Sequence, residues 1–167
     1  MSTYEFTIIA AGLDIGSADS TDRLFEAGCD DSTISFQRGA IILDFDREAR
    51  SLGAAIASAV ADVEKAGATV IHVEPDHLVN LSDIAARTGI TRAAASLYAK
   101  GERGTDFPVP VARVTTDSPL WDWVDVARWL YRQGRIPKEE LARARIVRKV
   151  NSSIESRREE SASAQAD

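Results

Sequence analysis

The sequence predicts an α+β fold made of two parts and a helical extension. Up to Asp76, apolar residues recur first with the period of a strand and then with the period of a helix, in alternation. These 76 residues carry 14 acidic and 5 basic side chains, whereas residues 77–135 carry 6 acidic and 8 basic ones. Aliphatic residues then recur every three or four positions beyond Pro137. We therefore place a domain boundary near Asp76.

Composition restricts the class of protein. The 167 residues are 44% hydrophobic and 28% charged, which is ordinary for a globular chain with a packed core. No apolar run is long enough to span a membrane, and Met1–Thr3 begins neither a basic nor an apolar leader. Cys29 is the single cysteine, so an internal disulfide is excluded. We expect a cytoplasmic protein without contact to a membrane.

The first strand and helix follow from side-chain period. Alternating apolar residues predict a strand over Tyr4–Ala11. Leu24 and Phe25 lie within a segment with an acidic start, which predicts a short helix over Ser20–Ala27. We expect Ser20 or Asp19 to cap this helix and Gly28 to end it.

A hairpin comes next. Thr33–Gln37 and Ala40–Phe45 are rich in β-forming residues, and only Arg38 and Gly39 separate them. A connection of two residues favours a tight turn between antiparallel neighbours.

A second helix and a fourth strand complete this part of the chain. Ser51 precedes apolar residues at helical spacing, and Gly67 follows them. Thr69–Val73 then has the pattern of a strand. The order β-α-β-β-α-β is that of the split βαβ, or ferredoxin-like, fold, in which two helices cover one face of a four-stranded sheet. The other face requires polar residues, a ligand, a partner or another copy of the chain.

The pattern changes after residue 77. Leu81, Ile84 and Ala85 predict one short helix, and Ala95 and Tyr98 predict another. We expect Ser82 to cap the first helix, Gly89 to supply a positive φ between them, and Thr91 to cap the second. Two short helices around a tight turn form a helix-turn-helix pattern.

A β-wing and a third helix are expected after this pair. Pro108 and Pro110 favour an extended chain over Phe107–Val111, and Thr116–Ser118 are turn formers. Asp122 is placed to cap the next helix. The apolar face of that helix, which we expect to pack beneath the pair, consists of Trp123, Val126, Ala127 and Leu130.

The stretch LSDIAARTGITRAAASLYAKGERG, followed by FPVPVARV and SPLWDWVDVARWL, resembles a known family. It is similar to the winged helix-turn-helix domains of the excisionase and AlpA type, within the MerR-like superfamily. The resemblance extends from Leu78 to about Gly134, and we assign residues 77–134 to this domain. It implies a protein that binds double-stranded DNA sequence-specifically, as a prokaryotic transcriptional regulator does.

The second helix of the pair would lie in the major groove. Arg92 has the only long forked donor on its outer side, which makes it the candidate for bidentate contact with guanine. The competing interpretation is that these residues are merely solvated, or contact a protein. Arg87, Arg113 and Arg128 are either phosphate contacts or plain surface charges. The predicted DNA-binding residues are Thr91, Arg92, Ala93, Ser96, Lys100, Arg103 and Arg113.

Beyond Gly134 the sequence predicts an amphipathic helix over residues 135–158 and a disordered tail over 159–167. A single small DNA-binding domain offers few phosphate contacts, so we expect a homodimer. The dimer forms either through the bare sheet face or through the stripe of the helix, unless the stripe folds back onto its own chain. The predicted dimer stripe consists of Leu141, Val147, Val150 and Ile154.

No residue pattern predicts catalysis, a metal site or a cofactor. Cys29 is followed by two aspartates but has no activating base nearby, and we interpret it as a partly buried thiol in a polar loop. His72 and His77 are poorly spaced for two ligands of one metal. Asp44 and Asp46 lie on one strand face, where a solvated face is favoured over a cation or basic partner.

A second function remains open beside the DNA-binding regulator. The acidic domain of residues 1–76 is suited to a basic protein partner. An adaptor or antitoxin-like protein would bind such a partner with this domain, while its helix-turn-helix domain regulates its own promoter.

Overall fold

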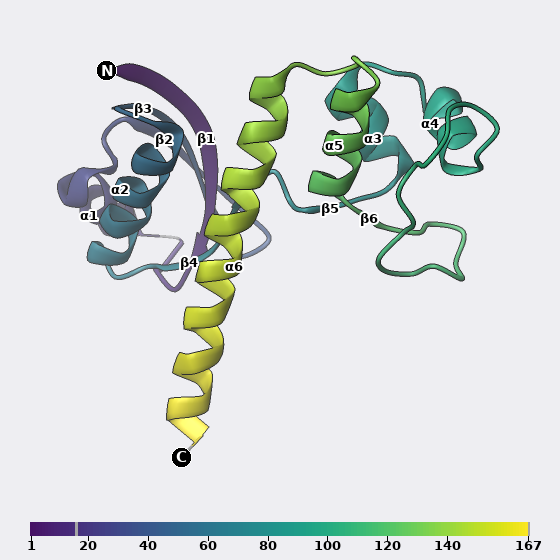
Figure 1. Ribbon diagram of the computed structural model, residues 1–167. Coiled ribbons are helices and arrows are strands. Elements are labelled where there is room, and N and C mark those ends of the chain that lie inside the picture. Colours follow the sequence, from purple (N-terminus) through teal and green to yellow (C-terminus); the bar gives the residue numbers. More distant parts are fainter. Residues whose placement is uncertain (16, 167) are drawn as a thin grey trace. The chain divides into compact units, whose positions relative to one another are not determined.

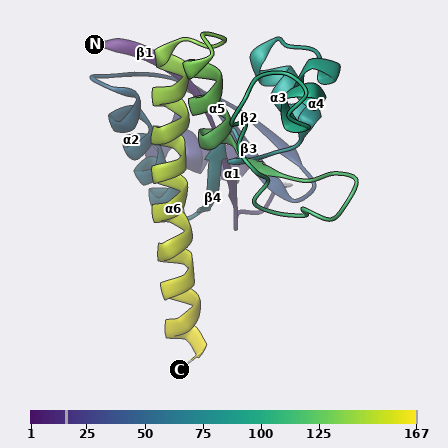
Figure 2. The same ribbon diagram turned by 45° about the vertical axis from the view of Figure 1, so that its right-hand side comes forward.

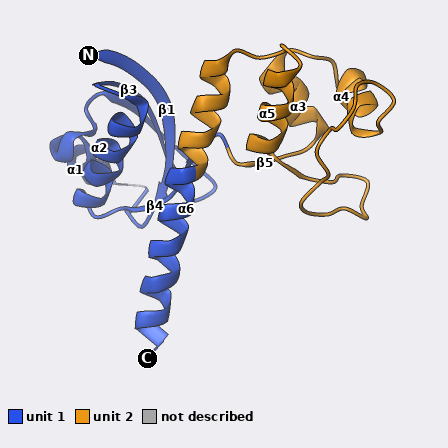
Figure 3. Cartoon of the chain, in the orientation of Figure 1, with its two compact units in different colours: residues 1–75, 149–167 blue, residues 76–148 orange. Residues whose placement is uncertain are grey.

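The computed structural model describes residues 1–15 and 17–166 and shows a mixed α+β fold, as predicted. The chain forms two compact units (Figure 3). Unit 1 comprises residues 1–75 and 149–167, and unit 2 comprises residues 76–148. The break after Pro75 is one residue before the predicted boundary. The C-terminal helix is not separate, because its first part belongs to unit 2 and its second part to unit 1.

Unit 1 is built on one antiparallel four-stranded sheet (Figure 1). The strands are ordered β2-β3-β1-β4, so β2 and β4 form the two edges. In chain order the elements are β1 (Ser2–Ala11), α1 (Ala18–Leu24), η1 (Phe25–Cys29), β2 (Ser32–Gln37), β3 (Ala40–Ala49), α2 (Leu52–Lys65) and β4 (Thr69–Glu74).

The predicted hairpin is confirmed and is longer than expected. Arg38 and Gly39 both have positive φ, 52° and 83°, which is the backbone of the turn that favours a two-residue hairpin. Strand β3 continues past Phe45 to Ala49 because β1 begins at Ser2 and pairs with it there.

The first helix begins earlier than predicted. Ser17, rather than Ser20 or Asp19, caps α1 by accepting from the backbone N–H of Asp19. The helix then widens into η1, one turn of π-helix, where Gly28 has φ 118°. A β-carbon on Gly28 would lie 2.7 Å from a carboxylate oxygen of Asp62, so both the backbone angle and the close approach favour glycine.

The core of unit 1 lies on the sheet face covered by helix α2. On this face Phe6 of β1 stacks on Phe45 of β3 with ring centroids 5.3 Å apart. The opposite face carries charged and polar side chains beside the half-buried pair Ile9 and Ile42, and there Asp44 accepts a hydrogen bond from Thr7 Oγ1 at 2.6 Å. The other buried strand residues on the covered face are Ile8, Ala10, Ile41, Leu43, Val70 and Val73.

Helix α6 (Lys138–Ala166) protects the β4 edge of this sheet. The side-chain amide of Asn151 accepts from the backbone N–H of Val73 at 2.7 Å and donates to its carbonyl at 2.9 Å. Asn151 thus takes the place that the next strand would occupy. Ile154, one turn further along, is buried in unit 1.

Replacing Asn151 with leucine is expected to lower the free energy of unfolding of unit 1 by roughly 1–3 kcal/mol, because Val73 loses the partners of two backbone groups. Chemical denaturation measures this loss. Asn151→Gln keeps the amide but misplaces it, and should lose most of the same stability. If both variants equal the wild type, the contact does not stabilise the edge.

Unit 2 contains the two short helices that the sequence predicts (Figure 2). Gly89 has φ 74° after the first helix, and Thr91 caps the second by accepting from the backbone N–H of Ala94, both as expected. The cap of the first helix is Asn80 rather than Ser82, because Asn80 and Asp83 form a reciprocal capping box. The elements are β5 (Leu78–Val79), α3 (Leu81–Thr88), α4 (Arg92–Ala99), β6 (Trp121–Asp122), α5 (Trp123–Arg132) and the first part of α6.

The segment between α4 and α5 forms a small antiparallel structure together with β5, which precedes α3. Strands β5 and β6 pair, and Ala112 forms a bridge with Leu120. The loop of residues 113–119 between the bridged positions contains a turn in which Thr116 N–H donates to the carbonyl of Arg113. Asp122 caps α5, as predicted.

An aromatic cluster holds this segment in place. Trp129 of α5 contacts Tyr98 and Phe107, with ring centroids 5.0 and 5.1 Å away. Its indole N–H donates to the carbonyl of Thr105 at 2.8 Å. A β-carbon on Gly104 would lie only 3.0 Å from the Trp129 ring, so the chain passes closely over it.

The stripe of α6 is occupied by its own chain. Leu141, Val147 and Ile154 are each at most 4% exposed, and Val150 is half-buried. These side chains are therefore not a free surface for a second copy. The stripe folds back onto its own chain, which is the alternative to the predicted dimer stripe. The helix also continues through Ala166, where a disordered tail had been expected from residue 159. None of the helices in residues 1–15 and 17–166 is both long and apolar enough to cross a bilayer.

Candidate nucleic-acid interface

The predicted DNA-binding residues of α4 lie on its solvent side. Arg92 and Ala93 are exposed and Ser96 is half-exposed, whereas Ala95 and Tyr98 are buried in the core of unit 2. Helical spacing puts Arg92, Ser96 and the capping residue Lys100 in one row. Thr91 is exposed as well, but its hydroxyl oxygen caps the helix.

Arg92 is held by a neighbouring helix. Its Nε donates to Ser82 Oγ, 3.1 Å away near the start of α3. Among the described residues, this is the hydrogen bond that the Arg92 side chain makes, and it uses Nε only. The two terminal nitrogens of the guanidinium are therefore available to a ligand. Ser82 was predicted to cap α3, but it instead supports Arg92. The spacing of Asn80 and Asp83, which is that of a capping box, is the sequence signal that Asn80 is the cap.

A hollow of about 60 Å³ joins Arg92 to the 113–119 loop. The N-cap Asn80 and the first two residues of α3, Leu81 and Ser82, line this hollow together with residues of the loop. Asp117 of the loop thus lines the same hollow as Arg92, a neighbourhood that was not predicted from the sequence. The remaining lining residues are Ser118 and Pro119.

The other predicted cations occupy two further segments. Lys100 and Arg103 are exposed at the end of α4, where Gly101 has φ 75° and the Arg103 N–H donates to the carbonyl of Leu97. Arg113 is exposed in the 113–119 loop with φ 51°. A basic row on α4 and a basic loop residue are the groups that unit 2 presents to a polyanion.

Two arginines left open by the sequence have partners inside unit 2. Arg87 lies over the Trp123 ring at 5.2 Å and donates to the carbonyl of Asp76 at 2.9 Å, so it ties the start of the unit to α5. Arg128 pairs with Asp125 at 3.5 Å on the same helix. We assign Arg87 a structural role.

A buried arginine organises unit 1. Arg47 of β3 is 7% exposed and forms a fork with both carboxylate oxygens of Asp31, at 2.8 and 2.9 Å. It also donates to Asp62 at 2.8 Å, to Ser58 at 3.1 Å and to the carbonyl of Gly28 at 2.6 Å. The hydrogen bond with Asp31 raises the pKa of Arg47 despite burial. The burial and the partners of Arg47 were not predicted from the sequence.

Cys29 lies beside this cluster and is fully buried. Burial, together with the charge of Asp62, raises the pKa of its thiol to about 11. A protonated, inaccessible thiol is a poor nucleophile. Cys29 is thus the last residue of η1 and not part of a polar loop, and it is more completely buried than expected.

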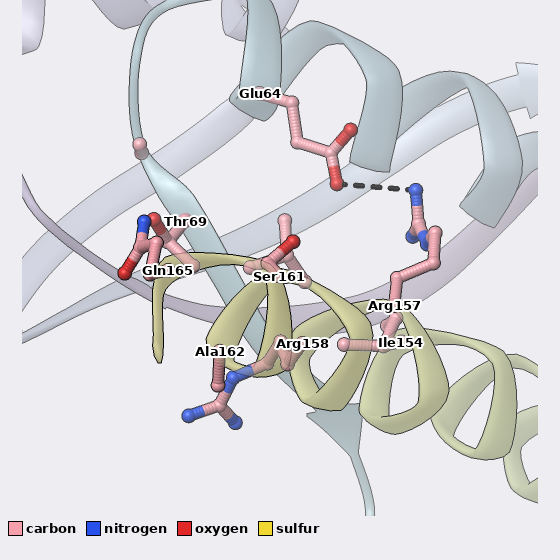
Figure 4. Close-up of a pocket in the computed structure, with 10 residues that line it drawn as sticks. Glu64, Thr69, Ile154, Arg157, Arg158, Ser161, Ala162 and Gln165 are labelled. Atoms are coloured by element: carbon pink, nitrogen blue, oxygen red, sulfur yellow. Dashed lines mark ion pairs between the residues drawn. The ribbon is translucent and has the colours of Figure 1, made fainter. Parts of the chain in front are cut away.

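A larger pocket of about 570 Å³ lies in unit 1, between the end of α2, the start of β4 and the last turns of α6 (Figure 4). Arg157 pairs with Glu64 at 3.4 Å across it. Arg158 also lines the pocket and makes no ion pair within residues 1–15 and 17–166. Polar groups of Thr69, Ser161 and Gln165 and apolar groups of Ala68, Val70, Ile154 and Ala162 complete the lining.

In the part of the chain that the structure describes, no group of three or more His, Cys, Asp or Glu side chains is placed to bind a metal ion. Comparisons with protein-family models, curated proteins and solved structures found no match for this chain.

Proposed function

We propose that the chain binds double-stranded DNA sequence-specifically and acts as a transcriptional regulator. The observation that carries this proposal is the geometry of Arg92, an exposed arginine at the first turn of α4 whose guanidinium Nε is held by Ser82 Oγ at 3.1 Å. A forked donor held in place at the start of a helix suits the acceptor edge of guanine in the major groove.

The proposal assigns a winged helix-turn-helix layout to unit 2. Helices α3 and α4 with the αL turn at Gly89 supply the pair, and the 113–119 loop supplies the wing. For unit 1 it assigns the ferredoxin-like layout, supported by the strand order β2-β3-β1-β4 and the antiparallel pairing of all neighbours.

Arg92→Ala is expected to weaken binding to the specific site by roughly 1–3 kcal/mol and to change binding to random DNA little, because only a base contact distinguishes sequences. The site is first selected from fragments of host genomic DNA, and affinities are then measured by fluorescence anisotropy. An equal loss on both DNAs would assign Arg92 to the phosphate backbone instead.

Phosphate contacts are tested with charge-matched variants. Lys100→Ala and Arg103→Ala should weaken specific and random binding alike, and log K should fall linearly with log salt. Arg132→Ala removes the same charge from an exposed position on α5 and serves as the control. A flat salt dependence, or an Arg132 effect equal to that of Lys100, would refute DNA binding through α4.

Unit 1 is proposed to bind an effector in the pocket of Figure 4, in the form of a small organic anion. The cavity of about 570 Å³ is lined by the Arg158 side chain and by apolar side chains of unit 1, and an apolar lining with a few polar groups is common in small-molecule sites. A screen of organic acids by thermal melting tests this. Stabilisation that Arg158→Ala abolishes supports the site, and a ligand that stabilises both variants equally binds elsewhere.

The adaptor or antitoxin-like function is the second candidate, and the exposed acidic residues Asp44, Asp46 and Glu48 on the open sheet face favour it. A basic protein partner would neutralise this face. A pull-down from the native host distinguishes the two functions. One stoichiometric basic partner supports the adaptor, and its absence together with tight operator binding supports the regulator.

A further inference from the structure

The two edges of the unit 1 sheet differ in their protection. Edge β4 is covered at Val73 by the Asn151 amide, which satisfies both backbone groups of that residue. Edge β2, with the sequence Ser-Thr-Ile-Ser-Phe-Gln, has neither a charged residue nor a proline. Proteins usually guard a free edge with such residues, because an unguarded edge pairs with another strand.

The turn of the hairpin determines which backbone groups of β2 face outward. Gln37 and Ala40 flank a two-residue turn and therefore form a hydrogen-bonded pair. The alternation along the strand then directs the N–H and C=O of Ser35 toward β3, and those of Ile34 and Phe36 away from it. Within the described residues, these outward groups of Ile34 and Phe36 have no hydrogen-bond partner.

Other surfaces of unit 1 are less suited to a second copy. The stripe of α6 is buried against its own chain at Ile154. The open sheet face carries Asp44, Asp46 and Glu48, so stacking two such faces would bring like charges together. The β2 strand carries no charged side chain, although unit 1 as a whole is acidic. Two β2 strands can therefore pair without bringing like charges together.

We propose that two copies of the chain associate through antiparallel pairing of their β2 strands, which joins the two sheets into one of eight strands. The two-fold axis passes between Ser35 and its counterpart, so that Ile34 of one protomer lies opposite Phe36 of its partner. Four hydrogen bonds then connect the outward backbone groups of these two residues. The inference goes beyond DNA binding, because it concerns unit 1 alone and holds whether or not unit 2 binds DNA.

The side chains fit this register. Ile34 and Phe36 lie opposite Leu43 and Ile41 of β3, so they belong to the helix-covered face, and Phe36 is 37% exposed at its edge. Pairing places each Ile34 beside a Phe36, a β-branched and aromatic cross-strand pair, twice per dimer. Because the paired area is small, the dimer should dissociate on dilution.

Disulfide trapping tests the register. In Ser35→Cys the two new thiols face each other in a non-hydrogen-bonded pair with Cα atoms about 4.5 Å apart, within disulfide reach. In Thr33→Cys, the matched control on the same strand face, the thiols are four residues apart along the strands, roughly 14 Å. Mild oxidation of the full chain should convert the Ser35 variant, and not the Thr33 variant, to a covalent dimer on a non-reducing gel. Equal trapping of both variants, or none of either, overturns the proposal.

Light scattering over a concentration series gives a second, independent measurement. The wild-type chain should shift from monomer to dimer as concentration rises, and Ser35→Lys, which puts two positive charges at the axis, should stay monomeric with an unchanged circular dichroism spectrum. A wild-type chain that is monomeric throughout, or a Ser35→Lys dimer, refutes β2 pairing. Neither assay contains DNA, so a failure of DNA binding is distinguishable from a failure of this proposal.

Discussion

Replacing Arg47 with alanine is expected to destabilise unit 1 by about 3 kcal/mol, because it removes one partner from a buried charge network. Asp31 and Asp62 would keep their charges and lose their counter-ion, and the carbonyl of Gly28 would lose its donor. Arg47→Lys retains the charge without the fork that spans Asp31, so it should lie between alanine and the wild type.

Denaturant titrations followed by hydrogen exchange measure the effect and locate it. The loss should appear in amides of β3, η1 and α2, which Arg47 connects, and not in those of unit 2. A combined Arg47→Met, Asp31→Asn and Asp62→Asn variant should recover part of the stability, because the unpaired charges are gone. If Arg47→Ala alone has wild-type stability, the network contributes nothing to folding.

Trp129→Ala is expected to have the largest effect in unit 2, a loss of roughly 3–5 kcal/mol, because a buried aromatic side chain leaves a cavity. Trp129 is 5% exposed and packs between Tyr98 and Phe107. Its removal frees the segment that begins at Gly104. DNA affinity should fall together with stability, since α4 carries Tyr98 on its inner side.

Trp129→Phe is the matched control. It fills most of the cavity and removes the indole N–H that donates to the carbonyl of Thr105, so the expected loss is only about 1 kcal/mol. Differential scanning calorimetry resolves the two variants. Equal losses for alanine and phenylalanine would mean that the hydrogen bond, and not the packing of the ring, holds the segment.

Local chemistry made the elements of this fold predictable. Gly89, Thr91 and Asp122 act where the sequence places them, because a positive φ and a capping oxygen depend only on a few neighbouring residues. The Arg38–Gly39 hairpin followed for the same reason. The cap of α3 was missed because Ser82 was chosen over Asn80, although the spacing of Asn80 and Asp83 is that of a capping box.

Long-range contacts were not predictable from local patterns. Arg47 continues the buried alternation of Leu43 and Phe45, but a charged residue in that position is identified as buried only when Asp31 and Asp62 are known to meet it. The apolar stripe of α6 predicted that these residues are buried against a surface. It did not predict that this surface belongs to the same chain. The support of Arg92 by Ser82 likewise depends on how two helices cross.

The Asn151 contact has a consequence for synthesis of the chain. Val73 precedes Asn151 by 78 residues, so a ribosome adding about 5–20 residues per second needs roughly 4–16 s between them. During that time all of unit 2 emerges, while β4 remains an open edge on a nascent sheet. The speed of translation and the access of chaperones while residues 76–150 are synthesised therefore affect how long the β4 edge can pair with another strand. Those residues contribute no strand to the unit 1 sheet.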